Sequence, residues 1–264
     1  MDEKLDILPK INRTDLIRAS KYLWVYFSLF ITDDMRRNHR EIMPRLNSSQ
    51  QTFLTFYFMD GSMRGSQSNF AEGWSIDGSF LKLIYDGYGE YVFESLFSKI
   101  IETWGAKNIS RIVEEARSLY EKHKDRVVEI KTLKELSALC MEITDFDKLD
   151  DEYFRISGDE TDKIKEYIEN NVNEFAIIDE SNSQVSSIDR DIKEMEEMER
   201  CSEEGKIIQK YIDDNKSKFT IISKNNTLVI KASEIFGKNY INPLTTSYNF
   251  GINGKRVTIE LEKD

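Results

Sequence analysis

The chain has 264 residues, of which 39% are hydrophobic, 11% aromatic and 32% charged. This length and composition predict one or two folded domains and exclude disorder over the whole chain. The net charge is −11, from 37 basic and 48 acidic residues. Direct binding to nucleic acid or to an anionic membrane is therefore not expected, because both need clustered Lys and Arg. A basic partner is compatible with this charge.

The cysteines and the start of the chain predict a cytoplasmic protein. Cys140 and Cys201 are the only cysteines, too few for a disulfide framework. The most apolar run, Tyr22 to Ile31, has about half the length that a membrane helix needs. The charged segment before it is unlike a signal peptide. We therefore expect a core helix at this run and no membrane segment.

Helical periodicity dominates most of the chain. Apolar residues from Ile109 to Tyr120 recur at helical spacing, with charged residues on the other side. A second stripe runs from Ile164 to Phe175, and Thr161 or Asp159 is a candidate cap for its start. Further helices are predicted at 13–31, 50–60, 76–86, 91–103 and 132–141.

The pattern changes near residue 217 to short β-branched runs. The runs 219–222 and 227–230 flank Asn225 and Asn226, and Asn253-Gly254 separates 248–250 from 257–261. Asn-Gly favours the positive φ angles of a two-residue hairpin turn. The expected fold is therefore mainly α, a compact multi-helix domain with a small C-terminal β-hairpin unit. The predicted divisions are 1–185 for the helical domain, 186–216 for an acidic helix or linker and 217–264 for the β-rich unit.

Charge is distributed unevenly along the chain. Residues 1–140 hold 20 basic and 20 acidic residues, whereas residues 141–204 hold 7 basic and 22 acidic residues, a net charge of −15. Residues 205–264 hold 10 basic and 6 acidic residues, a net charge of +4. The acidic excess therefore lies in one central stretch, and masking of that stretch by the basic tail is a hypothesis to test.

The sequence offers little for catalysis or for metal binding. Its only histidines, His39 and His123, lie in charged segments and are interpreted as surface residues. The stretch Gly61–Gly73 lacks the Gly-Lys-Ser/Thr ending of a phosphate-binding loop, so it is interpreted as a surface loop. The acids between 145 and 152 lack the order of an EF-hand, which favours a solvated acidic turn. We expect no catalytic residue, metal or cofactor; a hydrolase or metal-dependent enzyme using these acids or the 61–75 loop is the less favoured alternative.

Residues 77–120, together with a second stretch at 160–175, resemble the DNA-mimic protein 19 family. The family's Asn-Gly-Gly-Phe element appears as Asp77-Gly78-Ser79-Phe80, its Asn-Gly-Tyr-Gly element as Asp86-Gly87-Tyr88-Gly89, and its later Trp-Gly as Trp104-Gly105. The match covers about residues 13–180. It departs from the family at Asp77, Asp86 and Ser79, at the insertion-like loop 61–75, and after about residue 181.

The resemblance implies an all-helical fold that forms a homodimer. For the best-known member it implies an acidic surface that occupies the DNA-binding face of a transcription regulator. The motif residues themselves are interpreted as structural, since glycine permits close approach or positive φ and the aromatic side chains fill a core. An alternative is that Tyr88 and Tyr91 line a pocket or a dimer contact. The structural motif residues are Gly78, Phe80, Gly87, Tyr88, Gly89, Trp104 and Gly105.

The leading hypothesis is a non-enzymatic interaction protein whose acidic face engages a basic protein, such as a DNA-binding transcription regulator or a nucleoid protein. The alternative in the same class is an immunity-type or scaffold protein that recognises one partner by shape. The bland interpretation of the same acids is a solvated surface. The candidate partner-binding residues are Asp145, Asp147, Asp150, Asp151, Asp162, Glu166, Glu169, Glu194 and Glu197.

Overall fold

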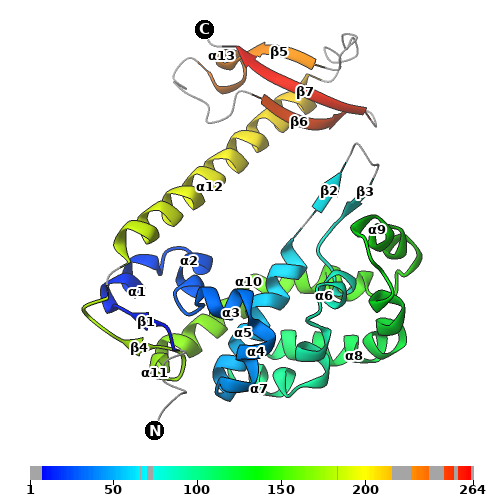
Figure 1. Ribbon diagram of the computed structural model, residues 1–264. Coiled ribbons are helices and arrows are strands. Elements are labelled where there is room, and N and C mark those ends of the chain that lie inside the picture. The colour runs from blue at the N-terminus through cyan, green and yellow to red at the C-terminus, as the bar shows by residue number, and fades with distance from the viewer. Residues whose placement is uncertain are drawn as a thin grey trace. The chain divides into compact units, whose positions relative to one another are not determined.

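The computed structural model describes residues 8–65, 67–69, 74–182, 184–215, 227–237, 247–252 and 255–262. The chain forms two compact units, Met1–Gln184 and Val185–Asp264. Helices make up most of the first unit and most of the described residues of the second, and the described strands pair only in small groups (Figure 1). The mainly α fold with a small C-terminal β unit is therefore confirmed, while the division of the chain into 1–185, 186–216 and 217–264 stays a prediction.

The first unit begins with short helices rather than with the single helix predicted over 13–31. Helix α1 ends at Ala19, and Tyr22 N–H bonds to the Ala19 carbonyl in the turn before α2. The apolar run from Tyr22 to Ile31 is buried as predicted, apart from partial exposure at three positions. The elements here are β1 (Lys10–Ile11), α1 (Arg13–Ala19), α2 (Leu23–Ser28), α3 (Asp33–Arg37), α4 (His39–Ile42) and a 3₁₀ turn (Met43–Arg45).

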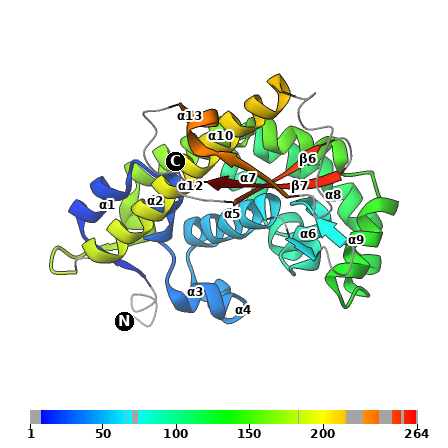
Figure 2. The ribbon, with the colours of Figure 1, turned by 90° about the horizontal axis from the view of Figure 1, so that it is seen from above.

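Helix α5 (Ser48–Arg64) runs through the middle of the first unit. Seen from above, α1 and α2 lie on one side of it and α6, α8 and α9 on the other (Figure 2). Asn47 and Gln50 form a capping box at its start. The helix continues past Gly61, and β2 (Gln67–Asn69) pairs antiparallel with β3 (Trp74–Ile76). The prediction of a surface loop at 61–75 is therefore wrong in two places. Residues 61–64 belong to α5, and part of the remainder forms the strands β2 and β3.

The next helices meet the predictions to different degrees. The amphipathic stripe at 109–120 lies in α8 (Lys107–Val128), and the helix predicted at 132–141 is α9 (Leu133–Glu142), which Thr132 and Glu135 cap. The helix predicted over 76–86 is shorter than expected, and the helix predicted over 91–103 is replaced by two separate elements, a π-helical turn and a helix. These are α6 (Phe80–Tyr85), a π-helical turn (Glu90–Glu94) and α7 (Phe97–Thr103).

Helix α10 (Asp147–Asn170) is the longest of the first unit, followed by α11 (Val172–Phe175) and β4 (Ile177–Ile178). It starts well before the predicted caps, Thr161 and Asp159, which lie inside it. The acidic turn predicted at 145–152 is largely the first turn of this helix. Acidic residues are favourable there, since the helix dipole places partial positive charge at the N-terminus. Strand β4 pairs parallel with β1.

A buried polar network joins α10 to α5. Tyr153 OH donates to Asp60 Oδ1, and Arg64 Nε donates to Asp60 Oδ2 at 2.6 Å. Arg64 Nη2 also donates to Ser157 Oγ at 3.0 Å. Asp60 and Tyr153 have no exposed surface, so the network fixes the register of the two helices within the core. The core of this unit also holds two groups of buried aromatic rings in mutual contact, one of Phe27, Phe30 and Phe53 and one of Phe80, Phe93 and Phe146.

The second unit consists of one long helix and a small sheet. Helix α12 (Val185–Asp214) contains the last part of the acidic stretch 141–204. It is followed by β5 (Thr227–Lys231), α13 (Ala232–Phe236), β6 (Ser247–Ile252) and β7 (Lys255–Glu262). Strands β6 and β7 pair antiparallel, as predicted, while the predicted turn residues Asn253 and Gly254 lie outside the described residues. Strand β5 pairs parallel with β7. The run 219–222, which was expected to pair with 227–230, lies outside the described residues.

Candidate functional site

Helix α10 places a row of acidic side chains on one side of the first unit. Six of its exposed residues are acidic and follow one another at intervals of three, four or eight positions, which keeps them on one side of a helix. They span about 33 Å along the axis at ~1.5 Å per residue. We call this row the acidic stripe; its members are Asp147, Asp151, Asp159, Asp162, Glu166 and Glu169.

Most carboxylates of the acidic stripe are unpaired. Glu169 lies 3.6 Å from Lys165 Nζ, whereas no ion pair is found for the other five among the described residues. Four basic residues lie between them in sequence. The Arg155 guanidinium faces Glu152 at 3.5 Å, Lys163 and Lys165 pair with Glu160 and Glu169, and the fourth is the exposed Lys148. The stripe is therefore a line of solvated negative charge along most of the helix.

Two predicted residues of the acidic face have structural partners. Asp145 precedes α10, and its Oδ2 accepts from Lys122 Nζ at 2.5 Å and lies 2.8 Å from His123 Nε2. Asp150 is only 9% exposed, and its Oδ1 accepts from Phe80 N–H at 2.9 Å. The Asp150 carboxylate is thus directed toward the start of α6 and is not part of the exposed row.

The remaining predicted acids fall in both units. Asp147, Asp151, Asp162, Glu166 and Glu169 come together on the acidic stripe. Glu194 and Glu197 are exposed residues of α12 in the second unit, where Glu197 lies 3.8 Å from Lys193 Nζ.

The environment of Asp150 changes its protonation. Burial is the main cause that raises its pKa, from 3.8 to about 7, and the nearby charges of Asp147 and Asp151 act in the same direction. The hydrogen bond from Phe80 N–H opposes them. A carboxyl group with this pKa is partly protonated near neutral pH.

Glu160 is an acid of α10 that the sequence analysis did not single out. It is 1% exposed, and its two oxygens accept from Asn108 N–H and Asn108 Nδ2, each at 2.9 Å. Lys163 Nζ lies 2.5 Å from it. Burial alone would raise the pKa of Glu160, but the bonds from Lys163 and Asn108 outweigh it and lower the pKa.

Glu160 therefore caps the N-terminus of α8 from another helix. The residue at the N-cap position of α8 is Ala106, whose side chain offers no acceptor. The sequence does carry a signal for this role, because Glu160 lies in register with the buried positions Tyr153, Ser157 and Ile164 of α10. A carboxylate in an apolar stripe indicates a buried partner.

The first and last of the family motifs lie next to the starts of α6 and α8, the two helices whose first N–H groups bond to acids of α10. A Cβ on Gly78 would collide with the Met63 carbonyl, so the chain passes there only as glycine. Gly105 has φ of +95°, which allows the sharp turn that ends at Ala106. The other motif residues pack around them: Phe80 and Trp104 are buried, Gly87 has φ of +85°, Gly89 touches Tyr120, and Tyr88 stacks on Phe58 with ring centroids 4.6 Å apart.

The interpretation of both histidines as surface residues is wrong. His123 is 6% exposed and packs against Phe146. His39 is half-buried among the rings of Phe58, Tyr88 and Tyr91, and its Nε2 has no hydrogen-bond partner among the described residues. Burial, and then the charge of Arg40, lowers the pKa of His39.

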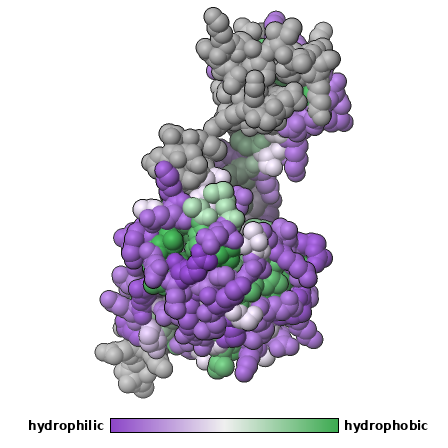
Figure 3. All heavy atoms as spheres, turned by 90° about the vertical axis from the view of Figure 1, so that its right-hand side faces the viewer, coloured by the Kyte–Doolittle hydropathy of each residue, from purple (hydrophilic) through white to green (hydrophobic). Residues whose placement is uncertain are grey.

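The described surface shows neither a metal centre nor a membrane segment. Within the described residues, no three His, Cys, Asp or Glu side chains come together as a metal site would need. No described helix combines the length and apolar character required to cross a membrane. The face of the first unit seen in Figure 3 is mostly hydrophilic, with small separate apolar patches.

Comparison with known proteins agrees with the motifs. Residues 44–171 match the family model described as DMP19-like protein. The DNA mimic protein DMP19 of Neisseria meningitidis serogroup B is 25% identical over 142 residues, which cover 52% of this chain and 77% of that protein. The resemblance inferred from the sequence is thereby confirmed, over a shorter span than the predicted 13–180. Residues 44–171, which lie in the helical first unit, are therefore similar to the DMP19-like family.

Proposed function

We propose that the acidic stripe of α10 binds a basic, DNA-binding protein in place of DNA, and that the chain acts by binding rather than by catalysis. The observation that carries this is the line of six exposed carboxylates on one helix, five of them without an ion-pair partner among the described residues. The family relationship supports it, since the relative from Neisseria meningitidis is described as a DNA mimic. The homodimer implied by the family stays a prediction.

The dimensions of the acidic stripe agree with this role. Its length of about 33 Å is close to one turn of B-DNA, ~34 Å. One DNA strand presents a phosphate every ~3.4 Å, or about ten over that length, so the acidic stripe has somewhat more than half the linear charge density of a strand. A protein that binds DNA through phosphate contacts would meet the same sign of charge here, without base edges to read.

The contacts of the histidines support a binding role over a catalytic one. His123 is engaged by Asp145 and Phe146, and His39 by aromatic rings. Neither shows a described contact with a Ser or Cys that could act as a nucleophile.

The test is affinity capture from a lysate of the source cells on the immobilised full chain. Bound proteins are eluted in parallel with a salt gradient and with a duplex DNA of about 20 base pairs, which covers roughly two helical turns. We expect a DNA-binding protein that both eluents release, because counterions and DNA compete for the same basic surface.

Two triple variants make the test specific for α10. Asp162→Asn, Glu166→Gln and Glu169→Gln neutralise half of the acidic stripe, and the matched control Glu41→Gln, Glu102→Gln and Glu129→Gln removes the same charge from other exposed positions of the first unit. The proposal requires that the control retains the partner and that the α10 variant loses it. If the wild type, the α10 variant and the control variant all retained the partner at high salt, the proposal would be contradicted and recognition by shape would be favoured.

A further inference from the structure

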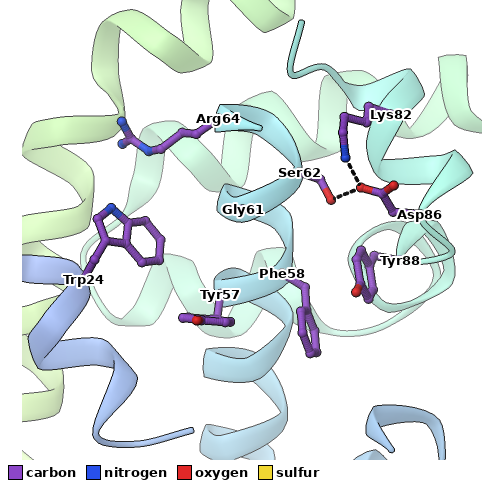
Figure 4. A pocket seen from close by; sticks show the side chains of 9 residues that line it. All are labelled: Trp24, Tyr57, Phe58, Gly61, Ser62, Arg64, Lys82, Asp86 and Tyr88. Atoms are coloured by element: carbon purple, nitrogen blue, oxygen red, sulfur yellow. Dashed lines mark hydrogen bonds and ion pairs between the residues drawn. The ribbon is translucent and has the colours of Figure 1, made fainter. Parts of the chain in front are cut away.

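A pocket of about 600 Å³ opens over α5 in the first unit, between α2 and the end of α6 (Figure 4). Pockets that hold small organic molecules commonly have about 300–1,000 Å³. Four aromatic side chains, Trp24, Tyr57, Phe58 and Tyr88, line this one. Such walls favour a planar apolar ligand, because rings gain from stacked or edge-to-face contact.

A buried ammonium group lies at one side of the pocket. The Lys82 side chain is 7% exposed, and its Nζ donates to Asp86 Oδ2 at 2.6 Å. Ser62 Oγ donates to the same oxygen at 2.6 Å. An ammonium has three N–H donors, and the described residues take one of those of Lys82. Asp86 also lines the pocket and pairs with this charge, and the two unused N–H donors of Lys82 favour a ligand that presents acceptor oxygens, such as a carboxylate.

A second cation lies at the other side. Arg64 uses Nε for Asp60 and Nη2 for Ser157, and its side chain remains 40% exposed. Figure 4 places its guanidinium on the side of Trp24, and Lys82 on the side of Tyr88. The pocket thus combines aromatic walls with cationic groups at both sides.

Gly61 keeps the centre of the pocket open. It lies inside α5, where glycine is less favourable than alanine by about 0.5–1 kcal/mol. A Cβ at Gly61 would meet nothing within 4 Å. Gly65 differs, since a Cβ there would lie 2.9 Å from the Gly61 carbonyl oxygen. Packing therefore explains glycine at position 65, whereas Gly61 has no such contact and lines the pocket.

From this geometry we infer that the first unit binds a small molecule with a planar apolar body and one carboxylate. The body lies over Gly61 between Trp24 and Tyr88, and the carboxylate accepts from Lys82 Nζ. This site is independent of the acidic stripe, so the molecule is a second ligand of the chain beside the proposed protein partner.

The test uses three probes with one ring system: 2-naphthoate, 2-naphthamide and 2-naphthylmethylamine. Binding to the full chain is measured by ligand-observed NMR. The expected Kd of 2-naphthoate is about 1 mM or tighter, and the expected order of affinity is carboxylate, amide, amine. The inference would be overturned if 2-naphthylmethylamine bound more tightly than 2-naphthoate, or if 2-naphthoate showed no saturable binding.

Two substitutions locate the site. Gly61→Leu places an apolar side chain in the pocket, where its Cβ meets nothing within 4 Å, and should weaken the binding of 2-naphthoate by about tenfold or more. Its matched control is Gly158→Leu, because Gly158 is also a helical glycine with nothing within 4 Å but lies outside this pocket. Lys82→Met should remove the preference for the carboxylate over the amide. Equal binding of 2-naphthoate to the Gly61 variant and the wild type would show that the pocket is not the site.

Discussion

On the exposed side of α10, Asp162 and Glu166 are solvated and have no ion-pair partner among the described residues. On the buried side of the same helix, Asp150 and Glu160 accept hydrogen bonds from the first residues of α6 and α8. The residue types are the same, but the surroundings give them opposite roles. The exposed acids are available to a partner, whereas the buried acids hold the fold in which the exposed row is displayed.

The largest effect is expected for Glu160→Ala. The substitution leaves the N–H of Asn108 without its acceptor and removes the partner of Lys163. The expected loss is about 3 kcal/mol in the free energy of unfolding, measured by urea denaturation. Glu166→Ala on the exposed side is the control and should change it by less than about 0.5 kcal/mol. Equal losses for the two variants would erase the distinction between the two sides.

Asp150→Asn should change how stability depends on pH. Because the folded pKa is raised to about 7, folded Asp150 takes up a proton at pH values where the unfolded chain does not. Its contribution to stability is therefore lost as pH rises from about 4 to about 7. Asn keeps an acceptor for Phe80 N–H and has no charge to bury. The variant should gain about 1–2 kcal/mol relative to wild type at pH ~8 compared with pH ~5, measured from urea midpoints; a constant difference would contradict the burial of this charge.

Gly158→Ala tests whether the exposed side of α10 is free of packing constraints. A Cβ at Gly158 would meet nothing within 4 Å, so the helix should gain about 0.5–1 kcal/mol in thermal unfolding. Its neighbour Ser157 is 1% exposed and accepts from Arg64. Ser157→Val should therefore lower the free energy of unfolding. If Ser157→Val stabilised the protein instead, the buried and exposed sides of α10 would not differ in their packing constraints.

The smallest effect on folding is expected for the triple variant Asp162→Asn, Glu166→Gln and Glu169→Gln. Exposed charges contribute little to stability, so the change should be below about 0.5 kcal/mol. Salt screens repulsion between like charges, and the melting temperature of the wild type should rise more with salt than that of the variant. A large loss of stability would show that these acids support the fold and are not reserved for a partner.

Several features could be predicted because they depend on local sequence. The apolar spacing at 109–120 predicts α8, the helical pattern at 132–141 predicts α9, and the β-branched runs on either side of Asn253-Gly254 predict the pairing of β6 with β7. The start of α10 was missed, because its first turn reads as a run of acids with few apolar residues. The break after Ala19 was also missed, since the residues on both sides are apolar enough to continue a helix.

By itself, the amino-acid sequence determined that the chain is mainly helical, that its acidic excess is concentrated in residues 141–204, and that its motifs resemble those of the DMP19-like family. Only the tertiary structure decided which of those acids remain exposed. Asp150 and Glu160 are buried because backbone N–H groups 70 and 52 residues away lack local acceptors and need a carboxylate. Helical periodicity reports which residues share a side of a helix, but the partners of that side come from distant parts of the chain.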